Sequence, residues 1–412
     1  GSENDNLAVG YGALGGSISG GEYNVAVGNY TLDANTEGDN NVAVGYNSLT
    51  ANTTGYSNTA VGFGTIEDNT SGEGNTGVGY YALMSNISGD RNTAIGNGAL
   101  SYNTTGDHNI GMGYNPLSEN TTGARNLAIG YRALDGQDTE NDNIAIGYDA
   151  LGGPIAGGEF NLAIGNYVLD ANTSGDYNVA LGNQAMSANT TGGSNLAIGH
   201  VALGSNTSGN YNVGVGHSGL NGNTTGLRNT ALGYGALDYP DTENDNLAIG
   251  YDALGGAIAG GEFNVAIGNY SLDANTSGDY NVGVGYNALS SNTTGVSNTA
   301  IGKGALEDNI SGEGNTGVGY VALANNTSAS YNTAIGNGVL AYNTTGAYNT
   351  GMGYNPLSSN TTGARNLAIG YGALDGPDTE SDNLAIGYDA LGGSIAGGEY
   401  NVAIGNYSLD AL

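Results

Sequence analysis

The chain has 412 residues with 38 acidic and six basic side chains, a net charge of −32, 77 glycines, and neither cysteine nor tryptophan. A surface this acidic repels phosphate backbones and anionic lipids, which argues against nucleic acid partners and against direct membrane insertion of this chain. Without cysteine, neither disulfides nor thiolate metal sites hold the fold, so its stability must come from another source.

A motif of the form Asn-x-(Ala/Gly)-aliphatic-Gly begins 24 times along the chain, from Asn6 to Asn401. The starts are 17 residues apart, except for steps of 18 into Asn24, Asn161, Asn264 and Asn401. Glycine falls at fixed phases of this repeat rather than in a flexible tract. A chain that repeats itself this regularly is a repeat array. Positions within each repeat are numbered below from the Asn, which is position 1.

The repeat positions predict strands separated by turns. Position 1 is Asn and position 5 is Gly in every repeat, position 3 is Ala or Gly, and positions 4 and 9 are aliphatic or Met. Position 6 is often Tyr, and positions 12 to 15 usually read Asn-Thr-Thr/Ser-Gly. Short β-prone segments between Asn/Gly-rich turns favour strands, and no stretch keeps the 3.6-residue period of a helix. The sequence therefore predicts an all-β fold, a β-solenoid with one 17-residue coil per repeat and 24 coils.

The strand pattern also suggests which positions lie inside. Side chains alternate along a strand, so positions 2, 4 and 6 face one way and positions 3 and 5 the other. We expect positions 4 and 9 to supply the large apolar groups of the interior, and the small 3/5 face to meet other chains. Stacked Asn at positions 1 and 12 predicts ladders of side-chain hydrogen bonds. Two large aliphatics are a thin core for one coil, so we expect chains to associate, as a homotrimer.

Two segments carry a resemblance to a known family. Asn92 to Gly106 reads NTAIGNGALSYNTTG, and Asn298 to Leu306 reads NTAIGKGAL. With the coil-per-repeat rhythm of nearly the whole chain, they resemble the YadA-like head repeats of trimeric autotransporter adhesins and related repeats of phage and marine bacterial fibres. The resemblance implies a left-handed parallel β-roll, a homotrimeric rod, and attachment to a host-surface glycan or protein receptor. The implied location is extracellular, on a cell surface or a virion fibre. The coils here are longer than YadA-type coils, so the resemblance does not carry over a ligand.

We interpret residues 1–412 as one continuous solenoid built by block duplication. Each block closes with an acidic coil and then an 18-residue coil that contains Gly-Gly-x-Ile-Ala-Gly-Gly-Glu. The sub-blocks are a partial block at 1–23, eight coils at 24–160, six coils at 161–263, eight coils at 264–400, and the start of a further block at 401–412.

The acidic coils are the candidate ion sites. Carboxylates at alternate positions of an extended segment lie on the same side, and oxygen ligands suit Ca²⁺. The candidate ligands are Asp138, Glu140, Asp142, Asp241, Glu243, Asp245, Asp378, Glu380 and Asp382. The structural alternative is an acidic loop on a soluble rod, and we expect no cofactor to be required.

Catalytic residues are not evident in the sequence. His108 lies at a different phase of the repeat from His200 and His217, and the Gly-x-Gly segments do not open helices. We therefore expect a structural protein rather than an enzyme.

Attachment is the favoured function class, with an ice-binding solenoid or a self-associating extracellular filament segment as alternatives. Ice binding is suggested by the threonine that recurs at position 13. However, paired threonines such as Thr104 and Thr105 are adjacent, so they face opposite ways if the segment is extended. A flat threonine array requires alternate positions instead, which favours the attachment fibre.

Overall fold

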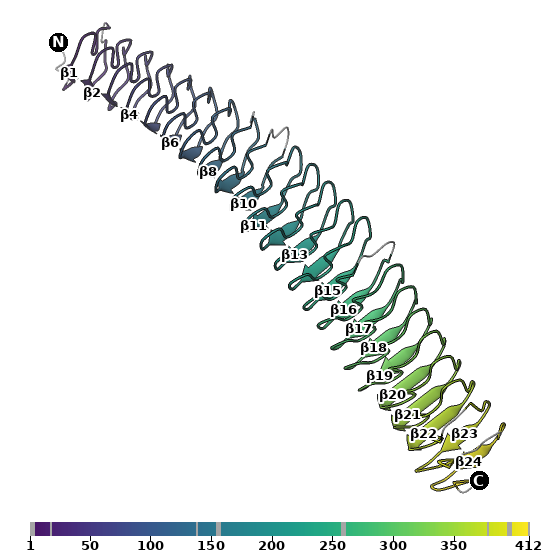
Figure 1. Cartoon of the computed structure of the whole chain (residues 1–412). Helices are drawn as coiled ribbons and strands as arrows, with labels where there is room; N and C mark the ends of the chain where they lie inside the picture. The colour runs from purple at the N-terminus through teal and green to yellow at the C-terminus, as the bar shows by residue number, and fades with distance from the viewer. Residues whose placement is uncertain are drawn as a thin grey trace. The chain divides into compact units, whose positions relative to one another are not determined.

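The computed structural model describes residues 5–16, 19–136, 139–153, 158–256, 261–376, 379–393 and 398–410. The chain divides into two compact units, Gly1–Ser208 and Gly209–Leu412. Their boundary falls inside the six-coil block 161–263 rather than between blocks. Across the described residues the secondary structure consists of strands and turns, with no helix (Figure 1).

Each repeat contributes one short parallel strand, which covers positions 2 to 4 except in β20, β21 and β22, where it extends to position 6. The strands of the first unit are β1 (Leu7–Val9), β2 (Val25–Val27), β3 (Val42–Val44), β4 (Thr59–Val61), β5 (Thr76–Val78), β6 (Thr93–Ile95), β7 (Ile110–Met112), β8 (Leu127–Ile129), β9 (Ile144–Ile146), β10 (Leu162–Ile164), β11 (Val179–Leu181) and β12 (Leu196–Ile198). Those of the second unit are β13 (Val213–Val215), β14 (Thr230–Leu232), β15 (Leu247–Ile249), β16 (Val265–Ile267), β17 (Val282–Val284), β18 (Thr299–Ile301), β19 (Thr316–Val318), β20 (Thr333–Asn337), β21 (Thr350–Tyr354), β22 (Leu367–Tyr371), β23 (Leu384–Ile386) and β24 (Val402–Ile404). The predicted all-β solenoid is confirmed.

Within each unit, neighbouring strands pair in parallel and in register, so each position stacks on the same position of the next coil. Ala60 of β4 pairs with Gly77 of β5, for example, and both are at position 3. Backbone hydrogen bonds continue outside the strands. The N–H of Leu49 at position 9 donates to the carbonyl of Thr65 in the next coil at 3.1 Å. Each coil is thus bonded to its neighbours around much of its perimeter.

The interior of a coil is narrow and is built from positions 1, 3, 8, 9, 12 and 15. The aliphatic side chain at position 9 is fully buried in every coil from Leu32 to Leu391. Position 4 lies on the outside instead, and Ile95 in β6 is 40% exposed. The prediction that position 4 is interior is therefore wrong. The Asn at position 1 and the small residue at position 3 are buried in the same interior, as Asn58 and Ala60 are.

The small residues at positions 3 and 5 meet atoms of their own chain. Ala128 at position 3 is fully buried within its coil. A Cβ built on Gly130 at position 5 would lie 2.1 Å from the carbonyl oxygen of Gly147 in the next coil. The prediction that the 3/5 face lies between chains is therefore wrong, since contacts within the chain already fill it.

Buried asparagines at position 12 form the predicted ladder of side-chain amides. Asn69 donates from Nδ2 to Oδ1 of Asn52 at 2.8 Å, and its own Oδ1 accepts from Nδ2 of Asn86 at 2.8 Å. The same Nδ2 also donates to the carbonyl of Gly72, which closes the turn of its own coil at 3.1 Å. Each amide therefore joins two coils and fixes one turn.

The ladder at position 1 has a different chemistry, because it runs from side chain to main chain. The backbone N–H of Asn58 donates to Oδ1 of Asn41 at 2.9 Å. Nδ2 of Asn58 donates to the carbonyl of Gly72, at position 15 of the same coil, at 2.8 Å. Position 1 therefore satisfies the backbone at the entry to each strand, where no strand bond is available.

We expect Asn69→Ala to lower the free energy of unfolding by about 1–3 kcal/mol, because it leaves the buried Oδ1 of Asn52 without a donor. The measurement is urea unfolding followed by circular dichroism. Asn97→Ala is the matched control, since Asn97 is exposed, and its effect should stay within about 0.5 kcal/mol. Equal effects of the two substitutions would contradict the ladder.

The coil turns through non-glycine residues in the left-handed region at positions 7, 9 and 17. Tyr81, Leu83 and Arg91 have φ values of 55°, 52° and 55°. This conformation costs an L-residue roughly 1–2 kcal/mol. Burial of the position-9 side chain and the hydrogen bonds between coils offset that strain. The sequence pattern did not predict this feature, because leucine has no preference for a left-handed turn.

Candidate functional site

The outer face of the strands carries the side chains of positions 2 and 4, which form a surface we call the outer stripe. In the 24 described strands these positions hold only Leu, Val, Ile, Met or Thr. Val61, Ile95 and Ile301 are 36%, 40% and 42% exposed. The chain has 38 acidic and six basic side chains, 44 charged residues in all. None of them lies on the outer stripe. Extended uncharged apolar surfaces of this kind mark sites of interaction.

Position 6 adds a column of aromatic rings next to the outer stripe, which we call the tyrosine column. Tyr131 stacks on Tyr114 and Tyr148 with ring centroids 5.3 and 4.8 Å apart and planes within 7°. Tyr354 and Tyr371 repeat this arrangement in the second unit at 5.1 Å. These rings are nearly half exposed. The tyrosines of position 6 thus form an exposed stack, on the same outward side as position 4.

In the acidic coils, the glutamates predicted as calcium ligands accept hydrogen bonds from their own loops. Glu140 takes position 15, where most coils have glycine, and is 7% exposed. Its carboxylate accepts from the N–H and hydroxyl of Thr139 at 2.8 and 3.1 Å. Glu243 accepts likewise from the backbone N–H groups of Asp241 and Thr242. These glutamates therefore close their own loops, as Glu380 does by accepting from the N–H of Thr379.

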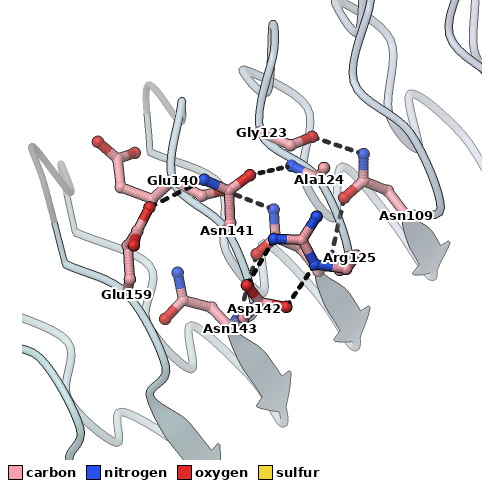
Figure 2. A network of polar contacts seen from close by, with 10 residues as sticks. Asn109, Gly123, Ala124, Arg125, Glu140, Asn141, Asp142, Asn143 and Glu159 are labelled. Atoms are coloured by element: carbon pink, nitrogen blue, oxygen red, sulfur yellow. Dashed lines mark hydrogen bonds and ion pairs between the residues drawn. The ribbon is translucent and has the colours of Figure 1, made fainter.

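The aspartates at position 17 face arginines of the preceding coil. Asp142 accepts two hydrogen bonds from Arg125, both at 2.7 Å (Figure 2). Between these coils, the side chain of Asn141 accepts from the N–H of Ala124 and donates to Glu159. The same bidentate ion pair recurs at Arg228 with Asp245 and at Arg365 with Asp382.

The ion pairs shift the titration of these carboxylates. Hydrogen bonds from Arg125 lower the pKa of Asp142 below its ordinary value of 3.8. The arginines of the two equivalent pairs lower the pKa of Asp245 and Asp382 in the same way. The stabilisation is therefore fully present above pH 3.8 and is lost as the pH falls through the lowered pKa of the folded state.

We expect Asp142→Asn to lower the melting temperature slightly at pH 7, since both partners are partly exposed and solvent screens the pair. The difference from the parent should vanish when melting is measured at a pH below the lowered pKa of Asp142, where the parent carboxylate is also neutral in the folded state. A difference that persists unchanged in acid would instead assign the effect to packing of the side chain.

Calcium binding by the acidic coils stays a prediction. Asp138 and Asp378, two of the nine candidate ligands, lie outside the described residues. Among the residues that the structure does describe, no group of three or more His, Asp or Glu side chains is placed to hold a metal ion. The described candidates instead have the loop and arginine partners given above.

The outer stripe is the surface that sequence reasoning missed. A two-residue period defines two faces of a strand, and here both are apolar or small, so the period alone does not identify the inner one. A signal was present in the threonines at position 2, such as Thr59, Thr76 and Thr93. A hydroxyl at a core position needs a hydrogen-bond partner, so these threonines favour an outward position 2, and position 4 shares its face.

Comparison with protein-family models gave no match, and no curated protein was found to be similar to the chain. The resemblance to YadA-like head repeats therefore stays a prediction from motifs. No helix long and apolar enough to cross a membrane occurs in the part of the chain that the structure describes.

Proposed function

We propose that the chain is a head or shaft segment of an extracellular attachment fibre, and that three copies associate through their outer stripes into a homotrimer. The single observation that carries this proposal is the outer stripe, which stays free of charge in all 24 described strands of a strongly acidic chain. In a solitary chain these side chains would face water without any structural reason to avoid charge.

A second copy of the same chain is the occupant that fits the stripe best. Coils repeat at one spacing within each unit of every copy, so the ridges of one stripe can match the grooves of another within that unit. From Leu32 to Leu391 each coil has one fully buried large side chain at position 9, and association would bury the side chains of positions 2 and 4 as well. At about 25 cal/mol per Å² of buried apolar area, even partial burial repeated coil after coil exceeds the cost of association.

The receptor side of the proposal rests on the exposed tyrosine column and on the exposed turns. Tyrosine offers apolar area with a polar hydroxyl, a combination that suits both glycan and protein partners. Adhesion to a host cell or surface, and a place on a bacterial cell surface or a virion, follow from the family resemblance alone.

Ice binding remains the second candidate, because β-solenoids with flat threonine arrays suit that function. The position-13 threonines that suggested it are already hydrogen-bonded. The hydroxyl of Thr53 donates to the carbonyl of Thr70 in the next coil at 2.9 Å, and that of Thr104 to Thr121 at the same distance. A thermal-hysteresis measurement separates the two functions, since an attachment fibre should show none.

We expect light scattering at physiological or higher salt to give about three times the chain mass of 41.0 kDa. Salt should favour the trimer, because screening weakens repulsion between chains that each carry a charge of −32. A monodisperse monomer at micromolar concentration would refute the trimer.

Ile95→Asp tests the interface itself. Ile95 is 40% exposed on the outer stripe, so the variant chain should keep its β-type circular dichroism while the trimer dissociates. Thr105→Asp is the matched control, because Thr105 is exposed in a turn away from the strand. Equal masses of both variants at every concentration would place the interface elsewhere.

A further inference from the structure

At some repeats of the tyrosine column, the residue at position 6 is not tyrosine and lies between the tyrosine rings of the two neighbouring coils. In the first unit, Phe63 lies between Tyr46 and Tyr80, with ring centroids 5.2 and 5.3 Å away. At the equivalent repeat of the second unit, Lys303 lies between Tyr286 and Tyr320, and its ammonium nitrogen is 5.9 Å from both ring centroids. The space between two tyrosines separated by two coils thus accommodates either a ring or a cation.

At two equivalent repeats this space is held by an asparagine, whose side chain is too short to fill it. Asn97 lies between Tyr80 and Tyr114 in the first unit, and Asn337 lies between Tyr320 and Tyr354 in the second. Both asparagines are exposed, and the four tyrosines are 47–50% exposed. Two strand spacings separate the rings of each pair, about 9.5 Å in all.

Asn29 and Asn269 also lie at position 6 between two tyrosines, but the ring of a neighbouring residue fills the space beside each of them. Asn29 accepts a hydrogen bond at its Oδ1 from the N–H of Tyr11 at 3.1 Å. Beside it, Tyr30 at position 7 bridges the column, with its centroid 5.5 Å from Tyr11 and 5.8 Å from Tyr46. Tyr270 does the same next to Asn269 in the second unit, 5.5 Å from Tyr251 and 6.0 Å from Tyr286. Position 7 beside Asn97 and Asn337 is glycine, Gly98 and Gly338, so no ring bridges the column there. The amides of Asn115 and Asn355, at position 7 of the next coil, lie against these glycines instead.

We propose that Tyr80, Asn97 and Tyr114 bind an alkylated ammonium group of the choline type, and that Tyr320, Asn337 and Tyr354 form a second copy of this site. A cation midway between the rings would lie about 5 Å from each centroid, within the range of a cation–π contact. The methyl groups of a quaternary ammonium would fill the space and contact both ring faces, as the ring of Phe63 does two repeats earlier. Lys303 gives the precedent for a cation in this environment, and the net charge of −32 attracts cations to the whole surface.

The two copies should differ in affinity. In the second unit the ammonium of Lys303 already makes a cation–π contact with the opposite face of Tyr320. Its positive charge repels a second cation bound to the same ring. In the first unit the corresponding neighbour of Tyr80 is the neutral Phe63. The site at Asn97 is therefore the tighter one.

The inference goes beyond the attachment function and does not require it. Exchanges at position 6 leave the residues of the outer stripe unchanged. The mass from light scattering and the binding of choline are therefore separate readouts, and either can fail alone.

The test is titration of the full chain with choline chloride, followed by saturation-transfer NMR of the choline methyl signal against sodium chloride at equal ionic strength. Two exposed cation–π contacts predict a Kd on the order of 100 mM. Asn97→Tyr should remove most of the signal, and Asn97→Tyr with Asn337→Tyr should remove all of it, because the new rings complete the column. Unchanged binding in the double variant would overturn the proposal.

A gain of binding gives the complementary check. Tyr131→Asn removes the central ring between Tyr114 and Tyr148, but Arg132 follows at position 7, so Arg132→Gly is added to reproduce the sequence at Asn97. This double variant should bind more choline than the parent, while Arg132→Gly alone should bind as the parent does. No gain in a variant with unchanged circular dichroism would count against the two-ring site.

Two further probes define the ligand chemistry. The saturation-transfer signal of methyl glucoside should be the same for the parent and for Asn97→Tyr. A glucoside signal that Asn97→Tyr abolishes would assign the site to sugars instead. Phosphatidylcholine vesicles and free choline share the headgroup cation. Co-sedimentation with such vesicles that is lost in the double tyrosine variant would support a lipid source, whereas binding of free choline alone would support a soluble one.

Discussion

Gly130→Val should unfold the coils around β8, with a loss of about 4 kcal/mol or more. Gly130 has φ +136°, a conformation that a residue with a Cβ rarely adopts, and the added atom would lie 2.1 Å from the carbonyl oxygen of Gly147. Both obstacles arise within one chain. Because a coil contacts mainly its neighbours, urea unfolding and limited proteolysis should show damage that begins near this coil.

Gly74→Ala is the matched control for Gly130→Ala. Gly74 also has a positive φ of +65°, but the nearest atom to its added Cβ is Cγ of Arg91 at 3.5 Å. This control should therefore cost only about 1 kcal/mol, the strain of a left-handed residue. Gly130→Ala should cost clearly more. If it altered only the concentration dependence of assembly, a second chain rather than Gly147 would have to be the close neighbour.

Leu134→Asp should be the most damaging side-chain substitution in the same coil, with a loss of several kcal/mol. Leu134 is fully buried, and an unpaired charge has no partner in a stack of position-9 leucines. Ile129→Asp is the control, since Ile129 faces outward from β8 and in a single chain the charge stays in contact with water. Like Ile95→Asp it should dissociate the proposed trimer, so both variants are compared at a concentration where the parent is also monomeric. Protease resistance measured on both variants distinguishes them. Similar losses would contradict the assignment of position 4 to the outer stripe.

The sequence predicted the coil, the parallel stacking and the burial of Leu134, because these depend on a pattern that recurs in every repeat. It predicted the ladder through Asn69 for the same reason. It placed Ile129 on the wrong side of the strand, since the period of two does not distinguish an inner from an outer face. The left-handed conformation of Leu83 has no sequence signal, so the path of the turn became evident only in three dimensions.

The candidate surfaces were predictable to different degrees. Stacked tyrosines follow directly from position 6. The ion pair between Arg125 and Asp142 had a signal in their separation of one repeat, which places them side by side in adjacent coils. The space beside Asn97 exists because Asn97 has a short side chain and Gly98 has none. It is recognised only when the ring positions of Tyr80 and Tyr114 are known.

The hydrogen bonds between coils have a mechanical consequence. Backbone bonds and the amide ladder at position 12 run from coil to coil, so tension applied to the two ends of one unit loads the outermost interface first. A released coil of 17 residues extends to about 55–60 Å, whereas it occupied only about 4.8 Å in the stack. Stretching should therefore proceed as a series of nearly equal steps of about 50–55 Å, one per coil, and each step dissipates work while the coils behind it stay folded.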